Sequence, residues 1–278
     1  MKNILVPTET HDVMPSVLAT ASFVQKRFGG YVEGFALRPA VPDYVPIDMV
    51  SGLAWHVDEK QDEDTRRQAH TLFETFMQER GLAALPPGRT GPGYGWHAKA
   101  PAGDLFVASH GRIFDLVVLG RPVAGKAQPS MASLEAVLFE SGRPVLIAPP
   151  TPPQSLGESI VIAWNHSTET ARSVAFASPF LREAKRIVVL SIEGWSVPGP
   201  DGEQLAASLR RNGHAVETVT APRSRRNDGE TILEQTLSLG GDLLIKGAYT
   251  QSRLRQMIFG GATSHVLAAA TVPVLMAN

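Results

Sequence analysis

The stretch SIVIAWNHSTETARSVAFASPFLREAKRIVVLSIEG, Ser159–Gly194, contains the pattern that decides the fold. An apolar run breaks into the polar residues NHS, a segment with helical spacing follows, and a second apolar run comes next. Continuous apolar runs are typical of strands in a parallel sheet, because helices cover such a sheet on both faces. The stretch therefore predicts a strand, a helix and a second strand parallel to the first.

The same order of elements occurs earlier in the chain. NILVPTE, which begins at Asn3, matches SIVIAWN, and GYVEGFAL matches RIVVLSIEG. Further along, FDLVVLG (114–120) matches GDLLIKG (241–247), and SGRPVLIAPP matches ATVPVLMAN at the end of the chain. Several matched elements in the same order indicate a duplicated unit. Each copy predicts five parallel strands alternating with helices, in a doubly wound α/β sheet.

A proline-rich segment separates the two copies. PPTPPQSLGE (149–158) combines prolines with small polar residues, and proline stiffens the chain and removes hydrogen-bond donors. This composition is typical of a short, semi-rigid linker. We therefore predict two tandem domains, residues 1–150 and residues 157–278.

The composition narrows the class of protein. The 278 residues carry a formal net charge of −1, without the basic excess that is typical of nucleic-acid binding. The absence of cysteine excludes disulfides, thiolate catalysis and cysteine-ligated zinc. No apolar stretch reaches the roughly 20 residues that span a bilayer, and the first residues do not resemble a signal peptide. We expect a cytoplasmic protein that binds neither nucleic acid nor membrane.

Two loops of the second copy are predicted to meet. Ligands of doubly wound sheets bind beyond the carboxyl ends of the strands, at the point where the strand order reverses. In the second copy this places WNHS, after the first strand, beside GAYTQSRLRQMIFGGAT, after the fourth. Backbone amides of a glycine-rich loop that leads into a helix often bind phosphate. The sequence therefore predicts an anion site at this edge.

On this fold, the two loops resemble those of the universal stress protein family, and the resemblance covers nearly the whole chain as two tandem copies. Nucleotide-binding members carry G-x2-G-x9-G-[ST] after the fourth strand and an aspartate after the first. The resemblance implies an adenine nucleotide alpha hydrolase-like fold. It also implies that the aspartate and nearby backbone hold adenosine, and that the glycine loop holds the phosphates of ATP or another adenine nucleotide, with Mg²⁺ as a candidate bridging ion.

The second copy keeps part of this motif. Gly247 matches the first glycine and Gly260 the third, whereas Thr250 occupies the position of the second. Gly261 occupies the Ser/Thr position, with Thr263 two residues further on, and Asn165 occupies the position of the aspartate. Asparagine still forms hydrogen bonds but lacks the charge, and Thr250 adds a Cβ where the chain approaches phosphate. The motif is weakened but not erased.

The resemblance implies further contacts in the second copy. It places the backbone of Ala163 and of Ile192 against adenosine. Arg253 and Arg255 lie within the loop, where either could pair with phosphate. The predicted nucleotide site therefore comprises residues of three segments: Ala163, Asn165, Ile192, Gly247, Thr250, Arg253, Gly260, Gly261 and Thr263.

The first copy departs further from the motif. Glu9 occupies the position of the aspartate, and Val123 and Ser133 occupy those of the second and third glycines. We therefore expect nucleotide binding in the C-terminal half alone.

No catalytic motif is present, so we predict no catalytic residue and at most slow ATP hydrolysis. His166 could act as a base or ligand, but a solvated or capping role is the simpler interpretation, with Ser167 as the N-cap of the next helix. The other histidines show no metal-ligand spacing, so no metal site is predicted. They are His11, His56, His70, His97, His110, His214 and His265.

Two alternatives to nucleotide binding stay open. The departures from the motif favour a family member that binds no nucleotide and acts as a protein-interaction module. An enzyme that acts on another phosphorylated small molecule is a third interpretation. In this family the last strand of each copy lies at a sheet edge, so we expect RPVLIAP and VPVLMAN to pair and to dock the copies with pseudo-two-fold symmetry. The sequence leaves open whether two chains form a homodimer.

Overall fold

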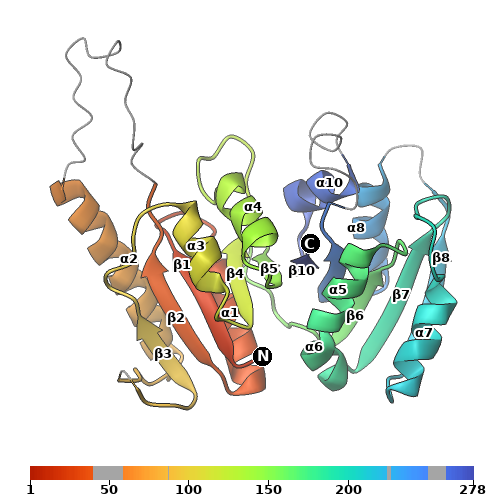
Figure 1. Cartoon of the computed structure of the whole chain (residues 1–278), viewed down its shortest axis with the longest axis horizontal. Coiled ribbons are helices and arrows are strands. Elements are labelled where there is room, and N and C mark those ends of the chain that lie inside the picture. The colour runs from red at the N-terminus through yellow and green to blue at the C-terminus, as the bar shows by residue number, and fades with distance from the viewer. Residues whose placement is uncertain (40–58, 87, 224–226, 250–260) are drawn as a thin grey trace, which may run out of the picture.

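The computed structural model describes residues 1–39, 59–86, 88–223, 227–249 and 261–278 (Figure 1). Its strands form one ten-stranded sheet in the order β3-β2-β1-β4-β5-β10-β9-β6-β7-β8. The strands are β1 (Asn3–Thr8), β2 (Tyr31–Ala36), β3 (Gly93–Trp96), β4 (Leu116–Gly120), β5 (Val145–Ala148), β6 (Ser159–Ala163), β7 (Arg186–Ile192), β8 (Val216–Ala221), β9 (Leu243–Gly247) and β10 (Val274–Ala277).

Helices cover both faces of this sheet. The helices described are α1 (Met14–Phe28), α2 (Glu59–Glu79), α3 (Asp104–Gly111), α4 (Met131–Glu140), α5 (Thr168–Phe176), α6 (Ser178–Glu183), α7 (Gly202–Arg211), α8 (Asp228–Ser238) and α10 (Ala262–Ala269). Helices α1, α2, α5, α6 and α7 pack into one hydrophobic core. Helices α3, α4, α8 and α10 pack into a second core on the opposite face. Each core runs through both halves of the chain.

The predicted repeat is confirmed by the strand order. The first five strands are arranged β3-β2-β1-β4-β5, and the last five repeat that arrangement from the outer edge inward as β8-β7-β6-β9-β10. All pairings within each half are parallel. The innermost strands have no exposed side chain, with β4 and β9 buried at every residue, which explains their continuous apolar sequences.

The two halves join along their last strands. Strand β5 pairs antiparallel with β10, and Leu146 opposite Leu275 occupies the middle of the three described pairs. The expected pairing of the two edges is therefore confirmed, and it relates the halves by a pseudo-two-fold axis at the seam (Figure 1). Pairing removes two apolar sheet edges that would otherwise attract other chains.

Side chains also join the halves on both sides of the seam. Arg27, in α1, donates to the backbone carbonyl of Leu156 at 2.7 Å and to the Glu183 carboxylate at 3.0 Å. The Tyr249 hydroxyl, just after β9, lies 3.3 Å from the Glu135 carboxylate of α4. The start of the loop that follows β9 is thus in direct contact with the N-terminal half.

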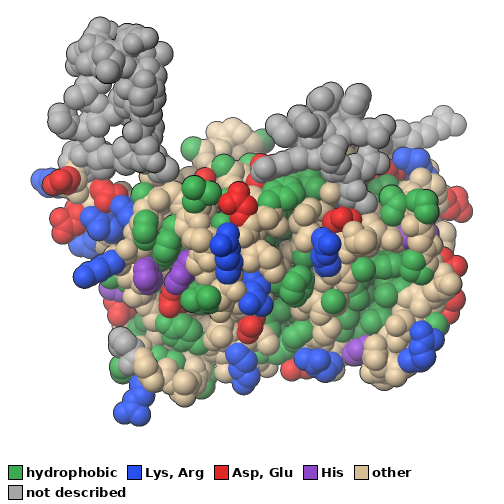
Figure 2. Space-filling view, in the orientation of Figure 1, with side chains coloured by type: hydrophobic (Ala, Val, Ile, Leu, Met, Phe, Trp, Pro, Cys, Tyr) green, Lys and Arg blue, Asp and Glu red, His purple; other side chains and the backbone are tan. Residues whose placement is uncertain are grey.

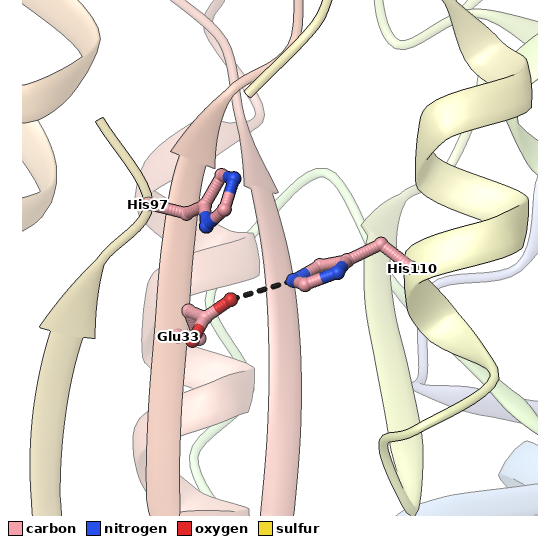
Figure 3. Close-up of side chains that lie close together, drawn as sticks. All are labelled: Glu33, His97 and His110. Carbon is pink, nitrogen blue, oxygen red and sulfur yellow. Dashed lines mark hydrogen bonds and ion pairs between the residues drawn. The ribbon is translucent and has the colours of Figure 1, made fainter. Parts of the chain in front are cut away.

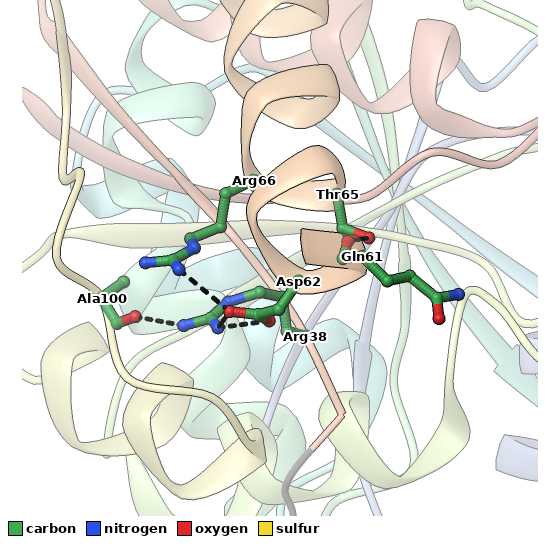
Figure 4. Close-up of polar contacts among 6 residues, drawn as sticks. All are labelled: Arg38, Gln61, Asp62, Thr65, Arg66 and Ala100. Carbon is green, nitrogen blue, oxygen red and sulfur yellow. Dashed lines mark hydrogen bonds and ion pairs between the residues drawn. The ribbon is translucent and has the colours of Figure 1, made fainter. Parts of the chain in front are cut away.

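A polar cluster fixes the end of β2 (Figure 4). Arg38 donates to the Asp62 carboxylate of α2 at 2.6 Å and to the Ala100 carbonyl, just before α3, at 2.7 Å. Arg66 lies 3.1 Å from the same carboxylate. The cluster holds α2 and the segment leading into α3 against β2, and so positions α3 over this half of the sheet.

The described surface is mixed in charge. Basic and acidic side chains alternate over the face shown in Figure 2 rather than gathering into a patch of one sign. No helix among the described residues combines the length and the apolar character needed to cross a membrane.

Candidate functional site

The site lies where β6 and β9 end. These strands are neighbours, with Ala163 opposite Lys246. The chain leaves β6 toward α5 on one face of the sheet and enters α10 on the other, so the strand order reverses here as predicted. The loop after β6 and the start of α10 therefore flank the same edge.

Lys246 is the only charged residue within the buried pattern of β9, and its side chain is 2% exposed. Its ammonium nitrogen donates to the Gly247 carbonyl at 2.9 Å and to the Thr263 hydroxyl at 2.7 Å. The Trp195 ring centroid lies 5.8 Å from the same nitrogen. An ammonium carries three donors, so these two hydrogen bonds leave one that has no acceptor among the described residues.

The electrostatics around Lys246 favour an anion. No carboxylate of the described residues forms an ion pair with it, and burial lowers the pKa of its amine to about 7. Its partner Thr263 is in the first turn of α10, whose N-cap residue Gly261 provides no side-chain hydrogen bond. The helix N-terminus adds partial positive charge and N–H groups that have no acceptor within the helix. A bound anion would complement both.

The repeat shows that the fold does not require this lysine. Lys246 in GDLLIKG matches Leu119 in FDLVVLG, and Leu119 is buried in β4 at 5% exposure. The N-terminal half therefore packs an apolar side chain at the same place. Lys246 was not among the predicted site residues, although a lysine that interrupts an apolar run directly before Gly247 is a usable signal in the sequence.

Asn165 takes part in the capping of α5. Its side-chain oxygen accepts hydrogen bonds from the Ser167 hydroxyl at 2.8 Å and from the Thr170 hydroxyl at 2.6 Å. Ser167 in turn accepts from the Thr170 backbone N–H, so the prediction that Ser167 is the N-cap is confirmed. The Asn165 oxygen is therefore already hydrogen-bonded within the protein.

The segment that follows β7 packs over the loop between β6 and α5. The Trp164 indole donates to the Pro200 carbonyl at 2.9 Å, and His166 Nδ1 lies 3.0 Å from the Val197 carbonyl. The His166 ring is therefore held by a backbone contact, and the φ of this residue, 67°, is in the left-handed region.

The two residues predicted to hold adenosine through their backbone are both buried. Ala163 pairs with β7 on one side and β9 on the other. The Ile192 carbonyl accepts a hydrogen bond from the Trp195 backbone at 3.1 Å.

Gly247 is needed for packing. A Cβ at this position would lie 2.5 Å from the Thr170 backbone nitrogen, so the missing side chain allows α5 to approach β9. Gly261 and Thr263 lie at the start of α10, beside Lys246. The other predicted loop residues, Thr250, Arg253, Arg255 and Gly260, lie outside the described residues.

The matching edge of the N-terminal half is built differently. A Cβ at Gly120 would lie 2.6 Å from the Pro129 ring, which packs against the end of β4. The Ser133 hydroxyl donates to the Asp104 carboxylate at 2.5 Å, and Glu9 lies 3.5 Å from His11. A surface cavity of about 450 Å³ remains here, lined by Thr10, His11, Asp12, Val13, Val123, Lys126, Ala127, Gln128 and Pro150.

Comparisons with known proteins agree with this fold. The model of the universal stress protein family matches residues 159–278, which span β6 to β10. The C-terminal half is a universal stress protein domain. The matched residues do not include the N-terminal half. That half nevertheless shares its strand order with this domain.

Solved structures show the same fold over the whole chain. A universal stress protein from Archaeoglobus fulgidus DSM 4304 superposes with a TM-score of 0.71 at 16% identity, covering 99% of this chain and 96% of the other. A protein of unknown function from Pseudomonas aeruginosa PAO1 gives a TM-score of 0.55 at 13% identity, covering 100% and 92%. No protein of curated function matches the chain significantly. The tandem arrangement of two such folds therefore has structural counterparts.

Proposed function

We propose that this protein is a stress-response regulatory protein that binds an adenine nucleotide in its C-terminal universal stress protein domain. Lys246, Thr263 and the Gly261 backbone bind the phosphates at the N-terminus of α10. The buried ammonium of Lys246, which has no carboxylate partner among the described residues, is the observation that carries the proposal. A phosphate supplies the missing negative charge, and lysine binds phosphate well as a point charge.

The adenine ring of the nucleotide would lie toward β7. Trp195 is partly buried beside Lys246 and offers an aromatic face on the same side of the sheet. Indole rings stack readily on flat aromatic groups. Because the Asn165 oxygen is already hydrogen-bonded to Ser167 and Thr170, its contribution to binding would be to hold this loop in place.

Titration of labelled ATP, with Mg²⁺, against the full-length protein tests the proposal. We expect Lys246→Met to weaken binding at least about 100-fold, because the variant loses the charge-assisted contact but keeps an unbranched side chain of similar length. Lys126→Met is the matched control, since Lys126 is an exposed lysine of the corresponding loop in the other half. Equal affinities of the two variants, or no binding by the wild type at millimolar nucleotide, would overturn the proposal.

Nucleotide affinity should also depend on pH through Lys246. Burial lowers the pKa of its amine to about 7, so above that pH the amine must take up a proton before it can pair with phosphate. We expect the affinity of the wild type to fall by up to about tenfold per pH unit above neutrality, because each nucleotide that binds requires Lys246 to take up one proton. Calorimetric titration in buffers of different ionisation enthalpy would measure the proton uptake, which should be absent in Lys246→Met.

A second candidate function is a protein-interaction module without nucleotide. The internal hydrogen bonds of the Asn165 side-chain oxygen and the Ile192 carbonyl favour it, because both groups were predicted to face adenosine. An ultraviolet spectrum after denaturation, taken on protein purified without added nucleotide, separates the two functions. Adenine absorbance in the released fraction supports nucleotide binding, whereas a spectrum of protein alone supports the interaction module.

A further inference from the structure

Three side chains of the N-terminal half converge beside β2 (Figure 3). Glu33 comes from the middle of β2, His97 directly follows β3, and His110 lies in the last turn of α3. One ligand atom of each lies within 4.8 Å of the other two, and all three residues are partly buried. These histidines show no metal-ligand spacing in the sequence, because 63 residues separate Glu33 from His97 in the chain.

We propose that Glu33, His97 and His110 form a binding site for a divalent transition metal, with Zn²⁺ as the best-suited ion. Two imidazoles and one carboxylate are a ligand set typical of zinc sites that keep a fourth position open. Zinc–ligand bonds of about 2.0–2.2 Å place tetrahedral ligand atoms roughly 3.3 Å apart. The observed cluster, within 4.8 Å, requires only small side-chain rotations to reach that spacing.

The surrounding residues hold two of the ligands in place. The Glu33 carboxylate lies 2.7 Å from His110 Nε2 through one oxygen and accepts from the Tyr31 hydroxyl at 3.2 Å through the other. Gly95 leaves room for that hydroxyl, because a Cβ at Gly95 would collide with it. Hydrogen bonds from neighbouring groups to a ligating carboxylate are the usual support of a metal site.

Aromatic packing orients the two imidazoles. Phe106 stacks on the His110 ring with a centroid separation of 5.0 Å and on the His97 ring with one of 5.6 Å. The two imidazole centroids lie 5.1 Å apart. No hydrogen bond joins the His97 ring to another described residue, although the ring points into the cluster (Figure 3). A metal ion would provide the partner that this ring nitrogen lacks.

The cluster is accessible from solvent. Glu33 and His97 line a surface cavity of about 720 Å³, which Trp96 and residues 85, 86 and 88–92 border. The side chains of Glu33 and His110 are each 18% exposed. An ion could therefore enter, and a water or a small ligand could occupy the fourth coordination position.

Zinc titration of the full-length, chelator-treated protein against a chromophoric competitor tests this proposal. We expect one equivalent to bind, and Glu33→Gln, His97→Gln and His110→Gln each to weaken binding at least about 100-fold, since each removes a direct ligand. His70→Gln is the matched control, because His70 is a histidine of the same half that stacks on Trp96 and lies 3.7 Å from Glu74.

Two further measurements make the outcome decisive. Co²⁺ substitution should give visible d–d absorption that changes in His97→Gln, and circular dichroism should show that Glu33→Gln keeps the fold. Lys246→Met should bind zinc like the wild type, which separates this site from the nucleotide site. Absence of zinc binding by the wild type, or equal affinities of the ligand variants and His70→Gln, would overturn the proposal.

Discussion

Lys246→Met is expected to be more stable than the wild type near pH 7 and less stable near pH 10, where the neutral lysine is no longer penalised. The pKa of the buried amine falls from 10.5 to about 7, so the native state resists protonation that the unfolded chain accepts. Near pH 7 this difference costs about 4 kcal/mol at 1.36 kcal/mol per pKa unit. The hydrogen bonds of Lys246 to Gly247 and Thr263 offset about 1–3 kcal/mol of this cost. The free energy of unfolding of the variant should therefore exceed that of the wild type by roughly 2 kcal/mol near pH 7.

The sign of the pH dependence follows from proton counts. Between about pH 7 and pH 10.5 the unfolded chain binds more protons than the native state at this residue. The free energy of unfolding therefore rises with pH across that window, by about 3–4 kcal/mol from Lys246 by pH 10, and the contribution is lost as pH falls toward 7. Lys246→Met should lack this rise.

Urea unfolding at a series of pH values, without nucleotide, measures the difference between wild type and variant. Lys126→Met should follow the wild type at every pH, because Lys126 is exposed and its ion pair with Asp12 lies at the surface. Parallel stability curves for wild type and Lys246→Met would show that burial does not lower the pKa of the Lys246 amine, and would remove the basis of the expected pH dependence of nucleotide affinity.

Leu275→Asp should separate the two halves of the sheet. Leu275 is fully buried and pairs with Leu146 across the seam between β5 and β10. The substitution loses an apolar contact and buries a carboxylate without a partner, which together cost about 4–5 kcal/mol. Because the seam is the only strand pairing between the described halves, we expect the two halves of the variant to unfold in separate transitions.

Denaturant unfolding followed by two probes, with binding of an apolar dye, measures this effect. Leu237→Asp is the matched control, since Leu237 is 53% exposed on α8 and its substitution should change stability by less than about 0.5 kcal/mol. A Leu275→Asp protein that unfolds in one transition at the wild-type midpoint would show that the seam contributes little to the coupling of the halves.

Much of the fold was predictable because its signals are local. The matched apolar runs identify the strands, since a strand buried on both faces must be apolar at nearly every residue. Their repeated order identifies the duplication, and the apolar last strands predict the seam at which Leu146 meets Leu275. The capping of α5 by Ser167 was equally local, because a side chain that caps a helix lies beside the N–H groups it accepts.

The candidate sites were predictable only in part. The reversal of strand order places Asn165 and Gly247 at one edge, but the glycine proved to make room for α5 and the asparagine to support its capping. The Lys246 side chain points toward the first turn of α10. This direction depends on how α10 packs against the face of the sheet that it shares with α3, α4 and α8. A one-dimensional pattern does not contain this information.

The amino-acid sequence alone predicted two tandem copies of a parallel α/β unit and the sheet edge at which the proposed nucleotide site lies, because apolar runs and their order repeat along the chain. Folding in three dimensions decided which polar groups meet. Lys246 reaches Thr263, and Glu33 reaches His97 and His110, across spans of chain that only sheet register and helix packing bring together. The charge of a buried lysine depends on its distance from its polar neighbours, and the affinity of a ligand cluster for a metal ion depends on the distances between its ligand atoms. No local sequence pattern encodes these distances.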